Sequence, residues 1–235
     1  MRTAICFSGK ARFIEYTNEN ILQNLILPME KYGDVDIFVH TSDDADGQYI
    51  KKIYSDRIKK IVFENDSPIE EKKIQHMQRN SLQNLLQMFY TRYRVSQIMS
   101  AHASDNNIEY THVIHSRMDV RYFNSIDLYN IVFADMSLIH IPDFHCWSCV
   151  QGKGYNDRFF ISNFDNAMYY FDLYKKYEQY SKEGHILHAE STLYYHLNKM
   201  NIDVKFFPFR FTRVRAGGVE EDSFIADFIP NGHGI

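Results

Sequence analysis

The stretch Thr111–Val120 constrains the fold more than any other part of the chain. It begins as a short apolar run flanked by polar residues, which is typical of a buried strand in an α/β sheet. It then places Arg117 and Asp119 two positions apart, and in an extended chain such residues point to the same side. Open α/β sheets bind their ligands at the carboxyl ends of central strands. The stretch therefore predicts a ligand site at a sheet edge, or alternatively an ordinary ion pair at the end of a strand.

The rest of the chain alternates between strand-like and helix-like segments, which favours an α/β fold with a mostly parallel central sheet between helices. Apolar residues at helical spacing predict helices over 20–29, 80–99, 165–180 and from about 190 onward, and short apolar runs predict strands over 3–7, 35–40, 59–63, 137–141, 156–162 and 204–207. With no internal repeat or linker in 235 residues, we expect one domain spanning 1–235.

Composition excludes several classes of protein. Apolar residues make up 45% of the chain and charged residues 24%, as in a globular protein. The net charge of −4 provides no general attraction to nucleic acid. No apolar run approaches the roughly 20 residues of a membrane helix, and the first strand is too short for the core of a signal peptide, so we expect a soluble, cytoplasmic protein. The C-x-x-C pair Cys146 and Cys149 has no second pair to complete a zinc site, which predicts reduced thiols without a function. The alternative is a zinc site in which His140 and His145 supply the missing ligands.

A polar turn, Ser8-Gly9-Lys10-Ala11-Arg12, follows the first predicted strand. Gly9 allows the backbone to approach a ligand closely, and Lys10 and Arg12 are cations that attract phosphate. The spacing is not that of a Walker loop. The turn predicts a nucleotide-binding segment, and a plain connection from strand to helix is the alternative.

The motif Ser116-Arg117-Met118-Asp119 resembles the R-x-D variant of the D-x-D motif of GT-A-type glycosyltransferases, and the Ser8–Arg12 turn is similar to the N-terminus of small bacterial and viral members. The resemblance implies a Rossmann-like three-layer fold. It also implies transfer of a sugar from a nucleoside-diphosphate sugar to a hydroxyl of a glycan acceptor. Asp119 would then ligate Mn²⁺ or Mg²⁺ at the diphosphate, as a hard cation with oxygen ligands. Arg117, in place of the first aspartate, would bind phosphate directly or pair with Asp119.

The resemblance also suggests roles for residues farther along the chain. Thr41, at the end of the second strand, would face the base and ribose, and Arg213 would bind the diphosphate. Both have plainer alternatives: a solvated loop with a capping aspartate for Thr41, and cover for the acidic run Glu220–Asp222 for Arg213. The C-terminal His233 would reach the metal, whereas a frayed chain end is the alternative.

Two carboxylates are candidates for the base that removes the acceptor proton. Glu190 falls in the first turn of a predicted helix, where an acidic residue also suits the helix dipole. Asp157 heads a predicted strand and is a candidate acceptor ligand or base, or else an ion-pair partner of Arg158.

Together these features predict a metal-dependent, inverting glycosyltransferase. Two alternatives remain open: a sugar-phosphate nucleotidyltransferase, which would release pyrophosphate, and a non-catalytic module that binds nucleotide sugars or glycans. The sequence does not specify the donor, the acceptor, the linkage or the oligomeric state.

Overall fold

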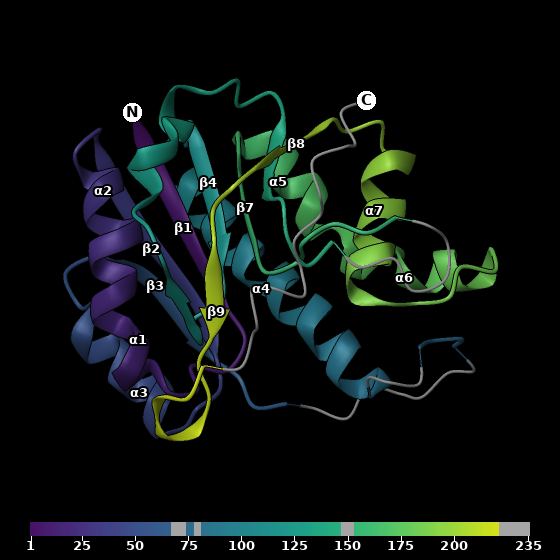
Figure 1. Cartoon of the computed structure of the whole chain (residues 1–235), viewed down its shortest axis with the longest axis horizontal. Helices are drawn as coiled ribbons and strands as arrows, with labels where there is room; N and C mark the ends of the chain where they lie inside the picture. The colour runs from purple at the N-terminus through teal and green to yellow at the C-terminus, as the bar shows by residue number, and fades with distance from the viewer. Residues whose placement is uncertain (67–73, 78–80, 147–152, 221–235) are drawn as a thin grey trace.

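A computed structural model describes residues 1–66, 74–77, 81–146 and 153–220 (Figure 1). The main sheet has the strand order β3-β2-β1-β4-β7-β6-β8, and β5 and β9 form a separate pair. The strands are β1 (Arg2–Ser8), β2 (Asp34–Thr41), β3 (Ile58–Phe63), β4 (His112–Ser116), β5 (Val120–Tyr122), β6 (Ile139–Pro142), β7 (Phe159–Ser162), β8 (Val204–Phe207) and β9 (Phe211–Arg213). The four strands β3, β2, β1 and β4 run parallel, β7 is antiparallel to both β4 and β6, and β8 is parallel to β6.

Helices cover both faces of the sheet (Figure 1). They are α1 (Ile14–Ile21), α2 (Leu27–Glu30), α3 (Ala45–Ile53), α4 (Leu82–Asn106), α5 (Phe164–Phe171), α6 (Leu173–Lys182) and α7 (Ala189–Lys199). A π-helical turn, Leu22–Ile26, joins α1 to α2, so the chain is helical from residue 14 to residue 30. The predicted sheet between helices is therefore present.

Two apolar cores, one on each face of the sheet, follow from the alternation of side chains along each strand. In β1, Ala4 and Cys6 pack into the core formed with α4 to α7, whereas Ile5 and Phe7 pack into the core formed with α1 to α3. All four are fully buried. A strand that is apolar on both sides can only lie inside such a three-layer arrangement.

Cys6 lies in the middle of this central strand, between β2 and β4. Its Sγ lies 3.5 Å from Sδ of Met99 on α4. Burial raises the pKa of the Cys6 thiol, so it behaves as a small apolar side chain.

Several boundaries differ from those predicted. The strand through Thr111–Val120 ends at Ser116, and Arg117 and Asp119 lie in the segment that connects it to β5. The predicted helix over 165–180 is two helices that meet at Asp172. Helix α3 and the β5–β9 pair were not predicted from the sequence.

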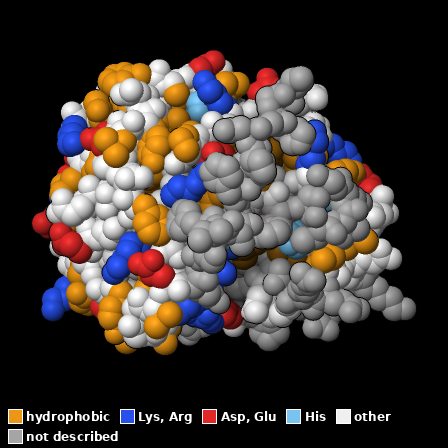
Figure 2. All heavy atoms as spheres, in the orientation of Figure 1, with side chains coloured by type: hydrophobic (Ala, Val, Ile, Leu, Met, Phe, Trp, Pro, Cys, Tyr) orange, Lys and Arg blue, Asp and Glu red, His pale blue; other side chains and the backbone are white. Residues whose placement is uncertain are grey.

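The surface is mixed in character. On the face shown in Figure 2, basic, acidic and apolar side chains are interspersed over the described residues. Within the ranges that the structure describes, no helix combines the length and the apolar character needed to cross a bilayer.

Candidate functional site

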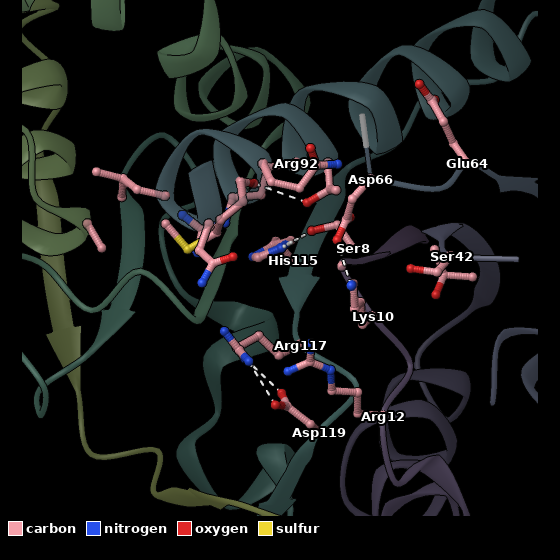
Figure 3. A pocket seen from close by; sticks show the side chains of 18 of the residues that line it. Ser8, Lys10, Arg12, Ser42, Glu64, Asp66, Arg92, His115, Arg117 and Asp119 are labelled. Atoms are coloured by element: carbon pink, nitrogen blue, oxygen red, sulfur yellow. Dashed lines mark hydrogen bonds and ion pairs between the residues drawn. The ribbon is translucent and has the colours of Figure 1, made fainter. Parts of the chain in front are cut away.

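A cavity of about 450 Å³ lies at the carboxyl ends of the four parallel strands β3, β2, β1 and β4 (Figure 3). Parallel strands present the backbone and side chains of their following loops at one edge, which is why this edge is the usual ligand site of open α/β sheets. Helix α4 and the start of α7 complete the wall. The polar and charged residues that line it include Ser8, Gly9, Lys10, Arg12, Thr41, Glu64, Asp66, Arg92, His115, Arg117, Asp119 and Arg213, and Ala189 lines it from α7.

The turn after β1 contributes the centre of this cavity. Gly9 adopts a φ of 94°, which favours glycine, and its N–H donates to the carbonyl of His40 at the end of β2. Lys10 forms an ion pair of 2.6 Å with Asp66, beyond β3. Arg12 is exposed and makes no hydrogen bond or ion pair within the part of the chain that the structure describes. The turn therefore presents one paired and one unpaired cation to the cavity.

Asp119 lies in a cluster of arginines at one end of the cavity. Its carboxylate accepts from Nε and Nη2 of Arg117, both at 2.7 Å, and from Nη1 of Arg215 at 2.9 Å. The β5–β9 pair holds this arrangement, because the N–H of Val214 donates to the carbonyl of Asp119 and Val120 pairs with Arg213. Burial would raise the pKa of Asp119, but the arginines outweigh it and lower that pKa to about 2. Asp119 is therefore ionised at any physiological pH.

Three buried polar atoms of lining residues have no hydrogen-bond partner among the described residues: Thr41 Oγ1, Arg92 Nη1 and His115 Nδ1. The other ring nitrogen of His115, Nε2, lies 3.0 Å from Ser8 Oγ. Burial lowers the pKa of His115 well below its usual value, so the imidazole is neutral. A buried polar group without a partner is costly, so these three atoms mark polar positions in the residues that line the cavity.

Behind the cavity wall lies a pair of buried carboxylates with contrasting partners. Asp157 accepts from Arg92 Nη2 at 2.7 Å, and the two side chains are 6% and 4% exposed. Burial opposes ionisation of Asp157, but Arg92 and Arg158 outweigh it and lower its pKa. Glu190 Oε2 lies 3.2 Å from His188 Nε2, and burial together with the nearby Asp157 charge raises the pKa of Glu190 to about 8. Glu190 can therefore exchange a proton near neutral pH, whereas Asp157 remains charged.

The structure brings most of the sequence-predicted binding residues to one cavity. Ser8, Gly9, Lys10, Arg12, Thr41, Arg117, Asp119 and Arg213 all line it. The predicted bases Glu190 and Asp157 do not line it, although their neighbours Ala189 and Arg92 do. His233 lies outside the described residues.

Sequence reasoning missed Arg92 and His115. Arg92 sits within a long amphipathic helix, where a cation usually indicates a solvated face. His115 was part of the central stretch, but nothing in its spacing indicated contact with Ser8. The ion pair of Asp157 was expected with Arg158, and the structure shows Asp157 paired with Arg92. Near the acidic run, Glu220 pairs with Arg121, and Arg215 pairs with Asp119.

The donor set at Asp119 does not fit a divalent cation. Mg²⁺ and Mn²⁺ require several oxygen ligands, whereas Asp119 is one carboxylate held between two guanidinium groups. Throughout the described residues, no group of three or more His, Cys, Asp or Glu side chains is placed to hold a metal ion.

The fold is shared with solved glycosyltransferase structures. Mouse xyloside xylosyltransferase 1, in its apo form, superposes with a TM-score of 0.50 at 14% identity, over 88% of this chain and 85% of that one. The galactosyltransferase LgtC, in complex with donor and acceptor sugar analogues, superposes with a TM-score of 0.51 at 9% identity, over 87% of this chain and 72% of that one. The chain thus has the GT-A-type α/β fold predicted from its sequence.

Sequence comparison gives the family. No curated protein sequence matches the chain. A family model described as "Domain of unknown function (DUF7796)" matches residues 1–216, and since this covers most of the chain, the protein belongs to that family.

Proposed function

We propose that the protein is a glycosyltransferase that moves a sugar from a nucleoside-diphosphate sugar to a hydroxyl group of a glycan acceptor. In this reaction the acceptor oxygen forms a bond to the anomeric carbon, and the bond from that carbon to the phosphate oxygen breaks. The acceptor proton passes to a base, and the nucleoside diphosphate leaves with the bonding electron pair. The protein must therefore neutralise the diphosphate and accept one proton.

The observation that carries this proposal is the charge of the cavity at the sheet edge. Five lining residues are cationic and three are anionic: Lys10, Arg12, Arg92, Arg117 and Arg213 against Glu64, Asp66 and Asp119. Asp157 behind the wall offsets the charge of Arg92. The positive charge that faces a diphosphate, which carries about two negative charges, therefore comes from the cations near Asp119: Arg12, Arg117 and Arg213. The volume of about 450 Å³ lies within the range of small-molecule sites. Superposition on the two glycosyltransferases supports the same activity.

The proposed base is Glu190, at the start of α7. Its pKa is raised to about 8, so a minority of molecules hold it ionised at neutral pH, and in that form it is a stronger base than an ordinary carboxylate. Its sequence neighbour Ala189 lines the cavity, so Glu190 lies next to the cavity wall at the start of α7. Asp157, held ionised by Arg92, makes the ionised form of Glu190 more basic, and Glu190 must release its proton to solvent before each turnover.

A base acting in a single displacement inverts the anomeric centre. Comparison of the anomeric proton coupling in donor and product by NMR tests this step. Retention of configuration would contradict a single displacement, while leaving the transferase activity itself in place.

The test of function is incubation of the full chain with a panel of nucleoside-diphosphate sugars, in Mn²⁺, in Mg²⁺ and in EDTA. We expect release of a nucleoside diphosphate from one donor, faster in the presence of a sugar acceptor, and a product heavier by one sugar in mass spectrometry. Glu190→Gln should lower turnover by roughly 10²–10⁴-fold with little change in donor affinity.

Other outcomes would identify another function. Release of pyrophosphate from a nucleoside triphosphate and a sugar phosphate would indicate a nucleotidyltransferase. Donor binding without release or transfer under any of the three conditions would indicate a binding module.

A further inference from the structure

We propose that the protein holds the donor diphosphate with arginine side chains and no divalent cation, and that Asp119 positions these arginines instead of ligating a metal. The inference rests on the proposed function, because it concerns how the same cavity binds its donor. It replaces the role that the R-x-D resemblance assigns to Asp119.

The carboxylate of Asp119 is already held by arginine side chains. The side chain is 4% exposed, and its two oxygens accept three charge-assisted hydrogen bonds, one on Oδ1 and two on Oδ2. The Arg117 contact is bidentate, the geometry in which a guanidinium holds a carboxylate most firmly. A metal ion at Asp119 would have to share a buried carboxylate that already accepts three charge-assisted hydrogen bonds.

The charge around Asp119 is mostly positive among the described residues. Arg117, Arg213 and Arg215 all contribute to the lowered pKa of Asp119, so three cations surround one carboxylate. Among the described residues around Asp119, this positive charge disfavours Mg²⁺ or Mn²⁺ and favours a diphosphate. The arginines can therefore supply the neutralisation that a metal ion supplies elsewhere.

The arginines around Asp119 are held in place but remain partly exposed. Arg117 and Arg215 are each 30% exposed, so Asp119 fixes one side of each guanidinium without burying it. Asp119 accepts from two N–H donors of Arg117 and from one of Arg215. Arg12 comes from the opposite element, the turn after β1, and Figure 3 shows it at the same end of the cavity as the Arg117–Asp119 pair. A diphosphate at this end would contact cations from both the β1 turn and the β4–β5 connection.

The experiment is isothermal titration of the full chain with each of a panel of nucleoside diphosphates, in Mn²⁺ and in EDTA. We expect Kd values that agree within about threefold between the two conditions. Arg12→Ala should weaken binding by roughly 10–100-fold, equally in both, because it removes a charge-assisted contact. Arg12 has no partner within the described residues, so this variant leaves the fold intact even where Asp119→Asn does not.

Asp119→Asn separates positioning from ligation. If Asp119 positions arginines, the variant weakens binding by the same factor in Mn²⁺ and in EDTA. If it ligates a metal, only the binding in Mn²⁺ weakens. Glu30→Gln is the matched control, because Glu30 also holds an arginine, Arg57, in a two-bond pair, at a position that does not line the cavity. It should leave both Kd values unchanged.

Two results would overturn the inference. Binding more than about tenfold weaker in EDTA than in Mn²⁺ would overturn it and leave the proposed function standing. So would an electron paramagnetic resonance signal of bound Mn²⁺ that appears only with the nucleoside diphosphate. Failure of every nucleoside diphosphate to bind in both conditions would overturn the inference and the proposed function together.

Discussion

At the residue scale, the raised pKa of Glu190 can be tested without a substrate. Its folded-state pKa is raised to about 8, above the value of about 4.3 in an unfolded chain. Between these values the folded protein holds a proton that the unfolded chain has lost, so stability falls as pH rises across this interval. Glu190→Gln cannot ionise. We expect it to melt like the wild type near about pH 5 and at a higher temperature near about pH 8.

Differential scanning calorimetry across this pH range measures the effect. Glu183→Gln is the control, because Lys199 and its neighbours lower the pKa of Glu183, so that side chain changes protonation only below the range tested. A melting curve of Glu190→Gln that parallels the wild type at all pH values would show that Glu190 is ionised in the folded protein.

Asp157, unlike Glu190, should stabilise the folded protein in its charged form. Removing its charge by Asp157→Asn leaves Arg92 buried without a counter-charge, and such losses cost about 3–5 kcal/mol. The control Glu30→Gln removes a carboxylate that is 30% exposed from an arginine pair, and should cost about 1 kcal/mol or less. Urea denaturation measures both. Equal losses would contradict a structural role for the Arg92–Asp157 pair.

At the scale of single elements, two glycine turns differ in what a methyl group would meet. Both have positive φ, 94° at Gly9 and 154° at Gly33. A Cβ at Gly9 would meet no atom within 4 Å, whereas one at Gly33 would lie 2.1 Å from the carbonyl oxygen of Met1. Gly9→Ala should therefore cost about 1–2 kcal/mol for the backbone conformation alone. Gly33→Ala should cost more, since the chain before β1 must also move.

Urea denaturation of the two variants ranks these costs. A Gly9→Ala protein less stable than Gly33→Ala would contradict the explanation.

The elements also show why part of the fold could be predicted from the sequence. Strands β1 and β4 were predicted because their residues are apolar on both faces, a pattern that only a covered sheet explains. Helix α3 was missed although its signal was present: Asp44 caps it, accepting from the N–H of Gly47 at 2.9 Å. The β5–β9 pair has no local signal, because strands of three residues each meet across some ninety positions of sequence.

At the scale of the whole molecule, the two cores share one sheet. Neighbouring residues of β1 contribute to opposite cores, so neither core can open without disturbing the strand that both use. We therefore expect one cooperative unfolding transition, as the single-domain prediction requires. Far-ultraviolet circular dichroism and tyrosine fluorescence should give coincident urea curves, and calorimetric and van't Hoff enthalpies should agree. Two separated transitions would contradict a single domain.

The candidate site could be predicted only where it follows the ends of strands. Lys10, Arg117 and Asp119 come directly after apolar runs, so topology alone brings them to one edge. Arg92 could not be found in this way, because its partner Asp157 lies 65 residues away and both become buried only when α4 packs on the sheet. Long-range burial of a charge has no periodic signature in one sequence.

The reactivity of the Cys6 thiol reports how often the central strand opens. A thiol reacts as its thiolate, and burial both raises the pKa of Cys6 and shields it completely from reagent. Alkylation of Cys6 must therefore wait until β1 separates from α4, whereas the half-buried Cys146 needs no such event. The rate at which iodoacetamide labels Cys6 under native conditions, followed by peptide mass spectrometry, thus counts how often the sheet opens at its centre.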